Sequence, residues 1–363
     1  MLRSLLRDKV LVGLIILTIL IKILALNETW VERYYTYGVY PVISTGLRVL
    51  FGWLPFSFGD IVYLAAVLYM ILKALKFFRV LKRRQMKEYL NRVLLRKFLR
   101  LVLCIYLVFN TFWGLNYNRL GIASQLKLDV KAYTIKDLDT LTFVLQERLN
   151  IYAASVDSTK RIALNHNQVL FKEAIASYKN IQKSISFLAY NYPSIKPSMY
   201  SHIGHYFGFT GYYNPFSGEA QIKTTVPFFL KPFVVLHEIG HQLGYGKENE
   251  ANFIAFISSR SSTNTEFRYS VYYEMHQYAI RELYRRDSVK AQFYRAQLHS
   301  QVEKDTKELI AYLLRSKNYV EPWITSFYDE YLKLNNQPKG KMTYNEVVAW
   351  LIAYQKKFGS EAL

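Results

Sequence analysis

Long apolar runs alternate with basic segments over the first third of the chain. Three of these runs cover 10–26, 61–78 and 98–115. Each is near the minimum length that crosses a hydrocarbon layer of about 30 Å. They predict three transmembrane helices, with Trp113 and Tyr117 expected in the aromatic belt at the membrane surface.

The apolar stretch 39–54 has a different pattern, because Pro41, Gly46 and Gly52 interrupt it. It predicts a re-entrant or interfacial segment rather than a fourth span. The run 10–26 follows a basic N-terminus, as a signal peptide also does, but it ends without a small-residue cleavage site. We therefore expect an uncleaved anchor.

Positive charge is concentrated on one side of the predicted spans. Residues 1–116 hold 17 Lys and Arg against 5 Asp and Glu, and 11 of the basic residues lie between Lys73 and Arg100. Basic loops face the cytoplasm, so the loop 79–97 is expected there. The sequence predicts a multi-pass protein of the cytoplasmic (inner) membrane, with 1–116 as the membrane domain and 117–363 as an extracytoplasmic domain. The same pattern argues against nucleic acid as a partner and makes the lipid bilayer the expected one.

Residues 117–363 have mostly helical periodicity. Helices are predicted at 134–154, 167–190, 248–260, 266–286, 287–316, 322–334 and 344–358, with a further helix that begins near Pro232 and stops near Gly244. Gly, Tyr, Phe and Thr are enriched in 202–225, and this segment predicts a small hairpin or meander. The expected fold class is mainly α with a small β-sheet.

The helix that begins near Pro232 carries the pattern His-Glu-x-x-His. His237 and His241 are four residues apart, so both imidazoles point to one face of the helix. Two imidazoles on one face can bind Zn²⁺, which activates a bound water, and Glu238 lies close enough to act as its general base. A buried helix with two hydrogen-bonded histidines is the structural alternative.

A catalytic zinc needs a third protein ligand and an open position. Gly244 and Gly246 allow a sharp turn after the motif helix, and Glu248 then shares a helical face with Asn252. We expect Glu248 to bind the metal and Asn252 to orient a ligand. Glu250 is the alternative third ligand.

The run Lys-Glu-Asn-Glu-Ala-Asn at 247–252 resembles the third-ligand helix of the gluzincin branch of zinc metallopeptidases. The resemblance implies a zincin-like α+β domain in which His237, His241 and Glu248 are ligands and Glu238 is the base. It also implies a strand beside the cleft, for which 211–222 is the candidate; an ordinary hairpin is the alternative. The layout of the whole chain is similar to a membrane family catalogued only as a domain of unknown function.

The residue that stabilises the oxyanion is left open by the sequence. The candidates are Tyr212, Tyr213, Tyr272, Tyr273 and His276. The expected function is a membrane-anchored zinc metallopeptidase that cleaves a peptide or protein segment near the membrane. Two alternatives are a zinc hydrolase of a non-peptide amide, such as a cell-wall component, and a membrane scaffold or transporter-like protein. A four-ligand site completed by Glu250 or His205 would favour the scaffold.

Overall fold

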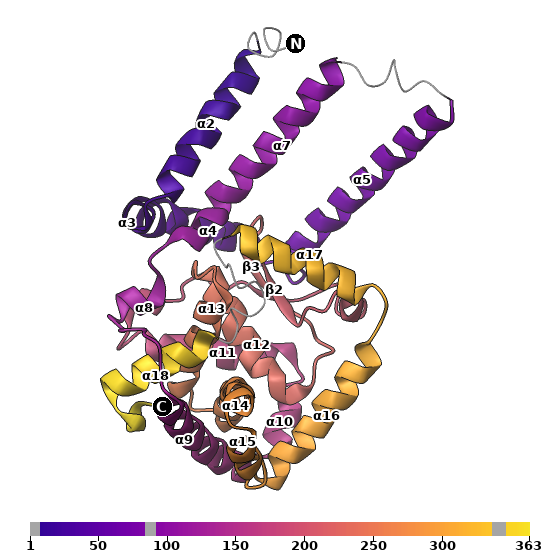
Figure 1. Cartoon of the computed structure of the whole chain (residues 1–363). Coiled ribbons are helices and arrows are strands. Elements are labelled where there is room, and N and C mark those ends of the chain that lie inside the picture. Colours follow the sequence, from indigo (N-terminus) through magenta and orange to yellow (C-terminus); the bar gives the residue numbers. More distant parts are fainter. Residues whose placement is uncertain (1–7, 84–91, 336–345) are drawn as a thin grey trace.

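A computed structural model describes residues 8–83, 92–335 and 346–363 of the chain. Three long helices protrude from one side of a mostly helical domain (Figure 1). They are α2 (Lys9–Ala25), α5 (Phe58–Lys82) and α7 (Arg92–Phe112). The predicted mainly helical fold with a small sheet is confirmed. The basic N-terminus before residue 8, the 84–91 part of the predicted basic loop, and the predicted helix start at 344 lie outside the described residues.

Within the described part of the chain, one helix is by itself long and apolar enough to span a membrane. This is α5, whose apolar window is entirely exposed. The helix α2 qualifies only together with the segment Glu28–Phe51, from which it is bent by 99°. The third predicted span begins inside α7 and continues beyond its end at Phe112. Its helical part, 98–112, is about 22 Å long, which is short for a crossing.

The segment after α2 lies against the domain. It contains α3 (Glu28–Trp30), the π-helix η1 (Val31–Val39) and α4 (Tyr40–Phe51), followed after α7 by the 3₁₀ helix η2 (Gly114–Asn118). Trp113 and Tyr117 are buried in a cluster with Val31, Tyr35 and Tyr40. Their expected place in a lipid-facing aromatic belt is wrong, because their rings are needed to fill the space between these helices and the domain.

Four helices from the middle of the chain come next. They are α8 (Gly121–Gln125), α9 (Ile135–Ala154), α10 (Ser158–Ala163) and α11 (Asn167–Ile181). Thr134 caps α9 through a reciprocal bond with Asp137, at the predicted boundary. The helix predicted to reach residue 190 ends at Ile181. Leu188 and Tyr190 remain buried through a short 3₁₀ turn, so their apolar character reflects core packing rather than helix continuation.

The sheet has three short strands in the order β1-β3-β2: β1 (Ile195–Pro197), β2 (Gly211–Asn214) and β3 (Glu219–Ile222). The antiparallel pair β2–β3 confirms the predicted hairpin, with Gly211 opposite Ile222. The parallel pairing of β1 with β3 was not predicted. A three-residue strand ending in proline gives almost no alternating pattern from which to recognise it.

The remaining helices follow in sequence. They are α12 (Lys231–Gln242), α13 (Glu248–Arg260), α14 (Thr265–Arg286), α15 (Ser288–Arg295), α16 (Ser300–Ser316), α17 (Glu321–Leu334) and α18 (Val347–Phe358). The predicted helix 287–316 is therefore two helices. Pro232 occupies the first turn of α12, and Gly244 adopts φ +91° just after it, a conformation that suits glycine at a helix end.

The sheet is fixed to the N-terminal end of α5. Glu219 of β3 is fully buried, and its carboxylate accepts the backbone N–H groups of Phe58 (3.0 Å) and Gly59 (2.7 Å). Tyr212 of β2 donates its hydroxyl to the buried carboxylate of Asp60. Glu219 satisfies two of the unpaired N–H groups at the start of α5, and the Tyr212–Asp60 bond adds a side-chain link, so the first turn of this helix and the sheet form one polar junction.

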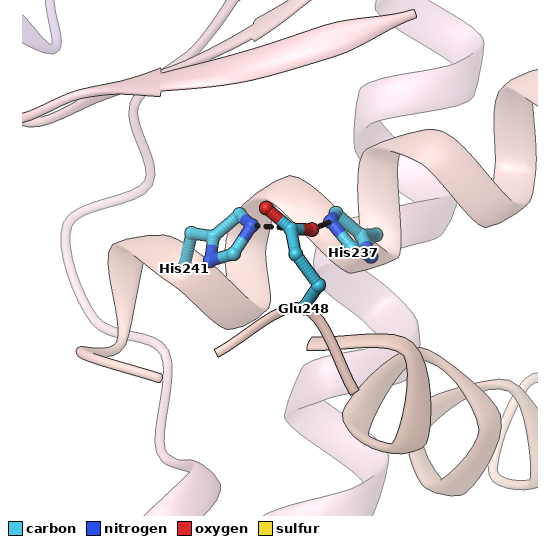
Figure 2. A group of neighbouring side chains, drawn as sticks. All are labelled: His237, His241 and Glu248. Atoms are coloured by element: carbon cyan, nitrogen blue, oxygen red, sulfur yellow. Dashed lines mark ion pairs between the residues drawn. The ribbon is translucent and has the colours of Figure 1, made fainter. Parts of the chain in front are cut away.

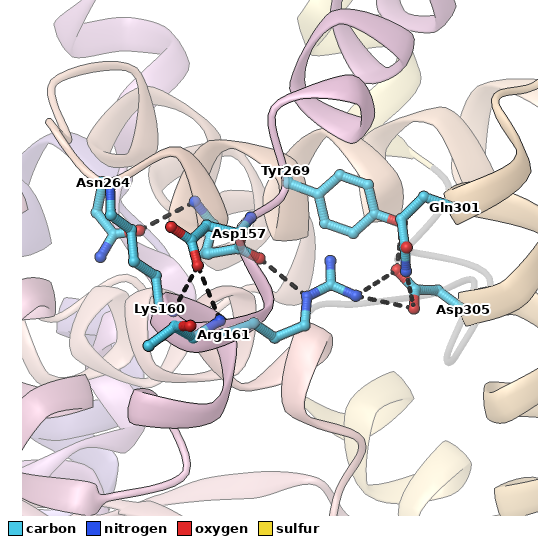
Figure 3. A network of polar contacts seen from close by, with 9 residues as sticks. Asp157, Lys160, Arg161, Asn264, Tyr269, Gln301 and Asp305 are labelled. Carbon is cyan, nitrogen blue, oxygen red and sulfur yellow. Dashed lines mark hydrogen bonds and ion pairs between the residues drawn. The ribbon is translucent and has the colours of Figure 1, made fainter.

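A second polar network joins α10, α14 and α16 (Figure 3). Arg161 pairs with Glu266 (3.0 Å) and Asp305 (2.8 Å), and their side chains are 12%, 3% and 2% exposed. Tyr269 and Gln301 also donate to Asp305. The arginine thus compensates two buried carboxylates that no longer contact bulk water.

We expect Arg161→Ala to lower the free energy of unfolding by about 3–5 kcal/mol, because it leaves two buried carboxylates uncompensated. Arg148→Ala is the matched control. Its partner Glu361 is 97% exposed, and this change should cost less than about 1 kcal/mol. Denaturant unfolding of the full chain in detergent checks both values. Equal losses in the two variants would contradict the role assigned to Arg161.

Candidate functional site

His237, His241 and Glu248 converge on one point between α12 and α13 (Figure 2). The Nε2 atoms of His237 and His241 lie 3.2 and 3.5 Å from the same oxygen, Oε2 of Glu248. One ligand atom from each residue falls within 4.8 Å of the other two. Three residues that are far apart on an extended chain therefore present the donor set of a metal site.

Close packing of the two helices brings Glu248 to the histidines. A Cβ at Gly240 would lie 3.4 Å from the Cα of Ala251, so α12 and α13 approach nearly backbone to backbone. The short connection between them turns at Gly244, which has a positive φ. Glu248 is the first residue of α13 and consequently points back across the turn towards the motif helix.

The outer nitrogen of each imidazole is held by an acceptor. Nδ1 of His237 lies 2.8 Å from Oδ1 of Asn252, and Nδ1 of His241 lies 2.7 Å from the carbonyl oxygen of Tyr245. Because a carbonyl oxygen only accepts, His241 must carry its proton on Nδ1, and the same assignment suits His237. With a proton on Nδ1, the Nε2 atom of each ring is the one that faces Glu248, and it is the nitrogen that would bind a metal once its own proton is lost.

The electrostatics of the cluster also suit a cation. Burial opposes ionisation of Glu248, yet the two neighbouring imidazoles hold its pKa well below the usual range. Burial lowers the pKa of His237. It also disfavours charge on His241, but the Glu248 carboxylate outweighs it and raises the pKa of His241 to about 9. An ionised carboxylate beside two nitrogen donors is a set that Zn²⁺ prefers, so the residues fit this metal.

Glu238 lies on the same helix, beside the sheet. It is 4% exposed, and its Oε2 has no hydrogen-bond partner among the described residues. Burial raises the pKa of Glu238 to about 8. A Cβ added at Gly211 of β2 would lie 2.7 Å from Oε1 of Glu238 and 2.9 Å from a methyl of Val234. The strand therefore approaches the carboxyl group as closely as a glycine allows.

The two alternative ligands named from the sequence lie elsewhere. Oε1 of Glu250 is directed at Gly121, and the described part of the chain gives Glu250 no place in the metal-binding group. His205 packs its ring on Tyr206, and its carbonyl accepts a hydrogen bond from Asn318. Within the described residues the candidate group thus consists of three side chains, and Glu248 rather than Glu250 is the third.

Two aromatic residues at the site were missed by sequence reasoning. The hydroxyl of Tyr328, on α17, donates to Oε1 of Glu248 at 2.7 Å. The ring of Trp113 stands edge-on to His241, with 6.0 Å between ring centres. Tyr213 of β2 packs on Trp113 in turn, at 4.6 Å. Tyr328 lies 80 residues beyond Glu248, and no local pattern in the sequence links the two.

The five residues considered for the oxyanion are in different places. Tyr212 donates to Asp60, Tyr272 donates to the carbonyl of Leu363, and Tyr273 bonds Thr306. His276 is fully buried on α14. Tyr213 packs on Trp113, which stands edge-on to His241. Tyr328, which is not among these five residues, donates its hydroxyl directly to Glu248.

Comparison with known proteins gives a family but no characterised relative. Neither the curated proteins nor the solved structures contain a match. A family model described as "Protein of unknown function (DUF3810)" matches residues 35–352. The matched region includes His237, Glu238, His241, Glu248 and Tyr328, together with α5 and α7. Because the match covers most of its length, the chain belongs to the DUF3810 family.

Proposed function

We propose that this protein is a membrane-anchored, zinc-dependent metallopeptidase that cleaves a peptide or protein segment close to the bilayer. The observation that carries the proposal is the convergence of His237, His241 and Glu248, with the outer nitrogens of both histidines held by acceptors. A purely structural pair of buried histidines has no need of an ionised glutamate between the two Nε2 atoms.

Zn²⁺ bound by these three residues would supply a Lewis acid and lower the pKa of a water. In this proposal Glu238 accepts a proton from that water and passes it to the leaving amine. Oε2 of Glu238 has no hydrogen-bond partner among the described residues, so it is free to accept this proton, and a Zn²⁺ bound nearby would favour the ionised carboxylate that a base requires. Tyr328 is placed to donate to a developing negative charge beside Glu248.

The position of β2 favours a peptide over a non-peptide amide. This strand is at one end of the sheet order, and within the described residues its outer edge pairs with no other strand. An extended peptide can pair with such an edge through main-chain hydrogen bonds. Gly211 brings that edge next to Glu238. A bound peptide would therefore lie along the side of the site where the general base is.

The proposed location is the cytoplasmic (inner) membrane, with α2, α5 and α7 as the membrane helices and the site on the extracytoplasmic side. The exposed apolar surface of α5 supports membrane insertion. The concentration of basic residues between Lys73 and Arg100 supports the orientation, because this segment joins the ends of α5 and α7 that lie away from the domain (Figure 1).

The first test is the metal content of the full chain purified in detergent. We expect one zinc per chain by elemental mass spectrometry, and cleavage of a quenched-fluorescence peptide library that a chelator abolishes and added zinc restores. A folded chain that takes up no zinc would refute the proposal. Zinc uptake with cleavage of cell-wall amides, but of no peptide, would support the alternative hydrolase instead.

Gly211→Ala should lower kcat/KM by about 100-fold while zinc content is unchanged, because the added methyl displaces Glu238 or the strand by a fraction of an ångström or more. Gly46→Ala is the control, since nothing lies within 4 Å of a Cβ at that position. Peptide cleavage by both variants measures the effect. Full activity in Gly211→Ala would show that the position of β2 does not affect the reacting groups.

A further inference from the structure

Helix α17 has one side that contacts the candidate metal site and another whose large apolar side chains are mostly exposed. On the inner side, Tyr328 bonds Glu248, and Tyr331 lies 3.3 Å from the hydroxyl of Tyr117. Leu332 is fully buried. This side of α17 forms the roof of the candidate site, since it covers a metal ligand directly.

The outer side of α17 is strongly apolar. Trp323, Phe327 and Leu334 are 80%, 76% and 84% exposed, and Val320 is 48% exposed. Their spacings of three, four and seven residues place all four on one stripe of the helix. Burial of such large apolar side chains away from water is favourable. A stripe of this kind indicates that another apolar phase covers it.

The position of α17 indicates which phase that is. The ring of Tyr331 packs edge-on against Phe109 near the domain end of α7, at 6.3 Å. Figure 1 shows α17 lying crosswise where α5 and α7 meet the domain, at the level of α3 and α4. Trp30 of α3 and Trp53 after α4 are also exposed, at 49% and 75%. Tryptophan is enriched at this depth of membrane proteins, where the hydrocarbon layer meets water.

The charges of α17 exclude attraction to anionic headgroups as the main force. Its three acidic residues, Glu321, Asp329 and Glu330, outnumber its one basic residue, Lys333. Lys333 is itself paired with Asp329 and Glu330 at 2.7 Å. Docking would consequently depend on insertion of the aromatic and aliphatic side chains, as in interfacial helices that lie in the plane of the membrane.

We propose that the outer side of α17 docks on the surface of the lipid bilayer. The helix that covers the metal site would then lie on the membrane. The surface is made of Val320, Trp323, Phe327 and Leu334. The docking itself does not depend on a metal, and only its significance for substrate access rests on the proposed function. A substrate would then reach the site along the membrane surface, from beside α17.

Single spin labels test the docking in the full chain. Cys104 is the one cysteine, so a Cys104→Ala background accepts a label at Phe327→Cys or, as a control, at Phe293→Cys. Phe293 is 63% exposed on α15, at the opposite end of the domain from α5 (Figure 1). The chain is placed in phosphatidylcholine nanodiscs, and collisions of each label with oxygen and with a water-soluble nickel complex are measured.

We expect oxygen collisions to dominate at position 327 and nickel collisions to dominate at position 293, a reversal of the ratio between the two sites. Addition of phosphatidylglycerol should not shift either ratio. Free access of the nickel complex to position 327 would overturn the proposal. Exclusion of both reagents would also overturn it, because it would indicate a protein partner or a second copy on this side. Neither result depends on zinc, so failure here leaves the proposed function standing.

Discussion

Glu238→Gln is expected to lower the rate of peptide cleavage by about 10²–10⁴-fold, the range that a general base contributes. The side chain keeps its shape, but an amide cannot accept the proton of the attacking water. Glu238 touches none of the three metal ligands through a hydrogen bond in the described residues, so zinc content should remain at one per chain. Cleavage assays beside elemental analysis measure both quantities on the same preparation.

The combination of lost rate and retained metal is what identifies a base. Loss of zinc together with activity would make Glu238 a residue that shapes the metal site. Retention of full activity would remove it from the mechanism and place the general base elsewhere. Gly211→Ala provides an internal comparison, because it disturbs the position of Glu238 without changing its chemistry.

Glu248→Gln should weaken zinc binding by more than about 100-fold, beyond the loss that is typical when a residue behind a metal ligand is changed. Glu250→Gln is the matched control. It makes the same chemical change two residues further along α13, at a side chain that is directed at Gly121. Competition with a zinc chelator of known affinity gives both constants, and we expect the control to bind as the wild type does.

The opposite outcome has a clear meaning. Weak zinc binding by Glu250→Gln, with normal binding by Glu248→Gln, would show that Glu250 is the third ligand. Helix α13 would then have to rotate about its axis to bring Glu250 to the histidines. Weak binding by both variants would indicate that the first turn of α13 acts as a unit. The shape of each side chain is preserved, so misfolding is a poor explanation for any of these results.

The proximity of His237, His241 and Glu248 could be predicted from sequence because its geometry is local. Two histidines four residues apart must share a helix face, and a glycine turn of a few residues returns the chain to them. Glu248 and Asn252 then follow from the same spacing rule on α13. The hairpin and several helix boundaries were also predictable, since a cap, a proline or a glycine marks them, as Thr134 does for α9 and Pro232 and Gly244 do for α12.

The walls of the site could not be predicted, because they depend on contacts between distant segments. Trp113 precedes His241 by 128 positions, and Tyr328 follows Glu248 by 80. Both look like surface aromatics when only their neighbours are considered. The misplacement of Trp113 and Tyr117 has the same origin: an aromatic residue at the end of an apolar run has the same local pattern whether it faces lipid or a second layer of protein.

The polar junction between the sheet and α5 has a consequence for how the protein can be divided. The strand β2 lies with Gly211 on the motif helix and with Tyr212 bonded to Asp60 at the start of α5. Glu219 completes the connection through the first N–H groups of α5. A chimera that keeps 117–363 but takes residues 58–60 from an unrelated protein would lose all three bonds. The first turn of α5 and the sheet would therefore have to be exchanged as one unit.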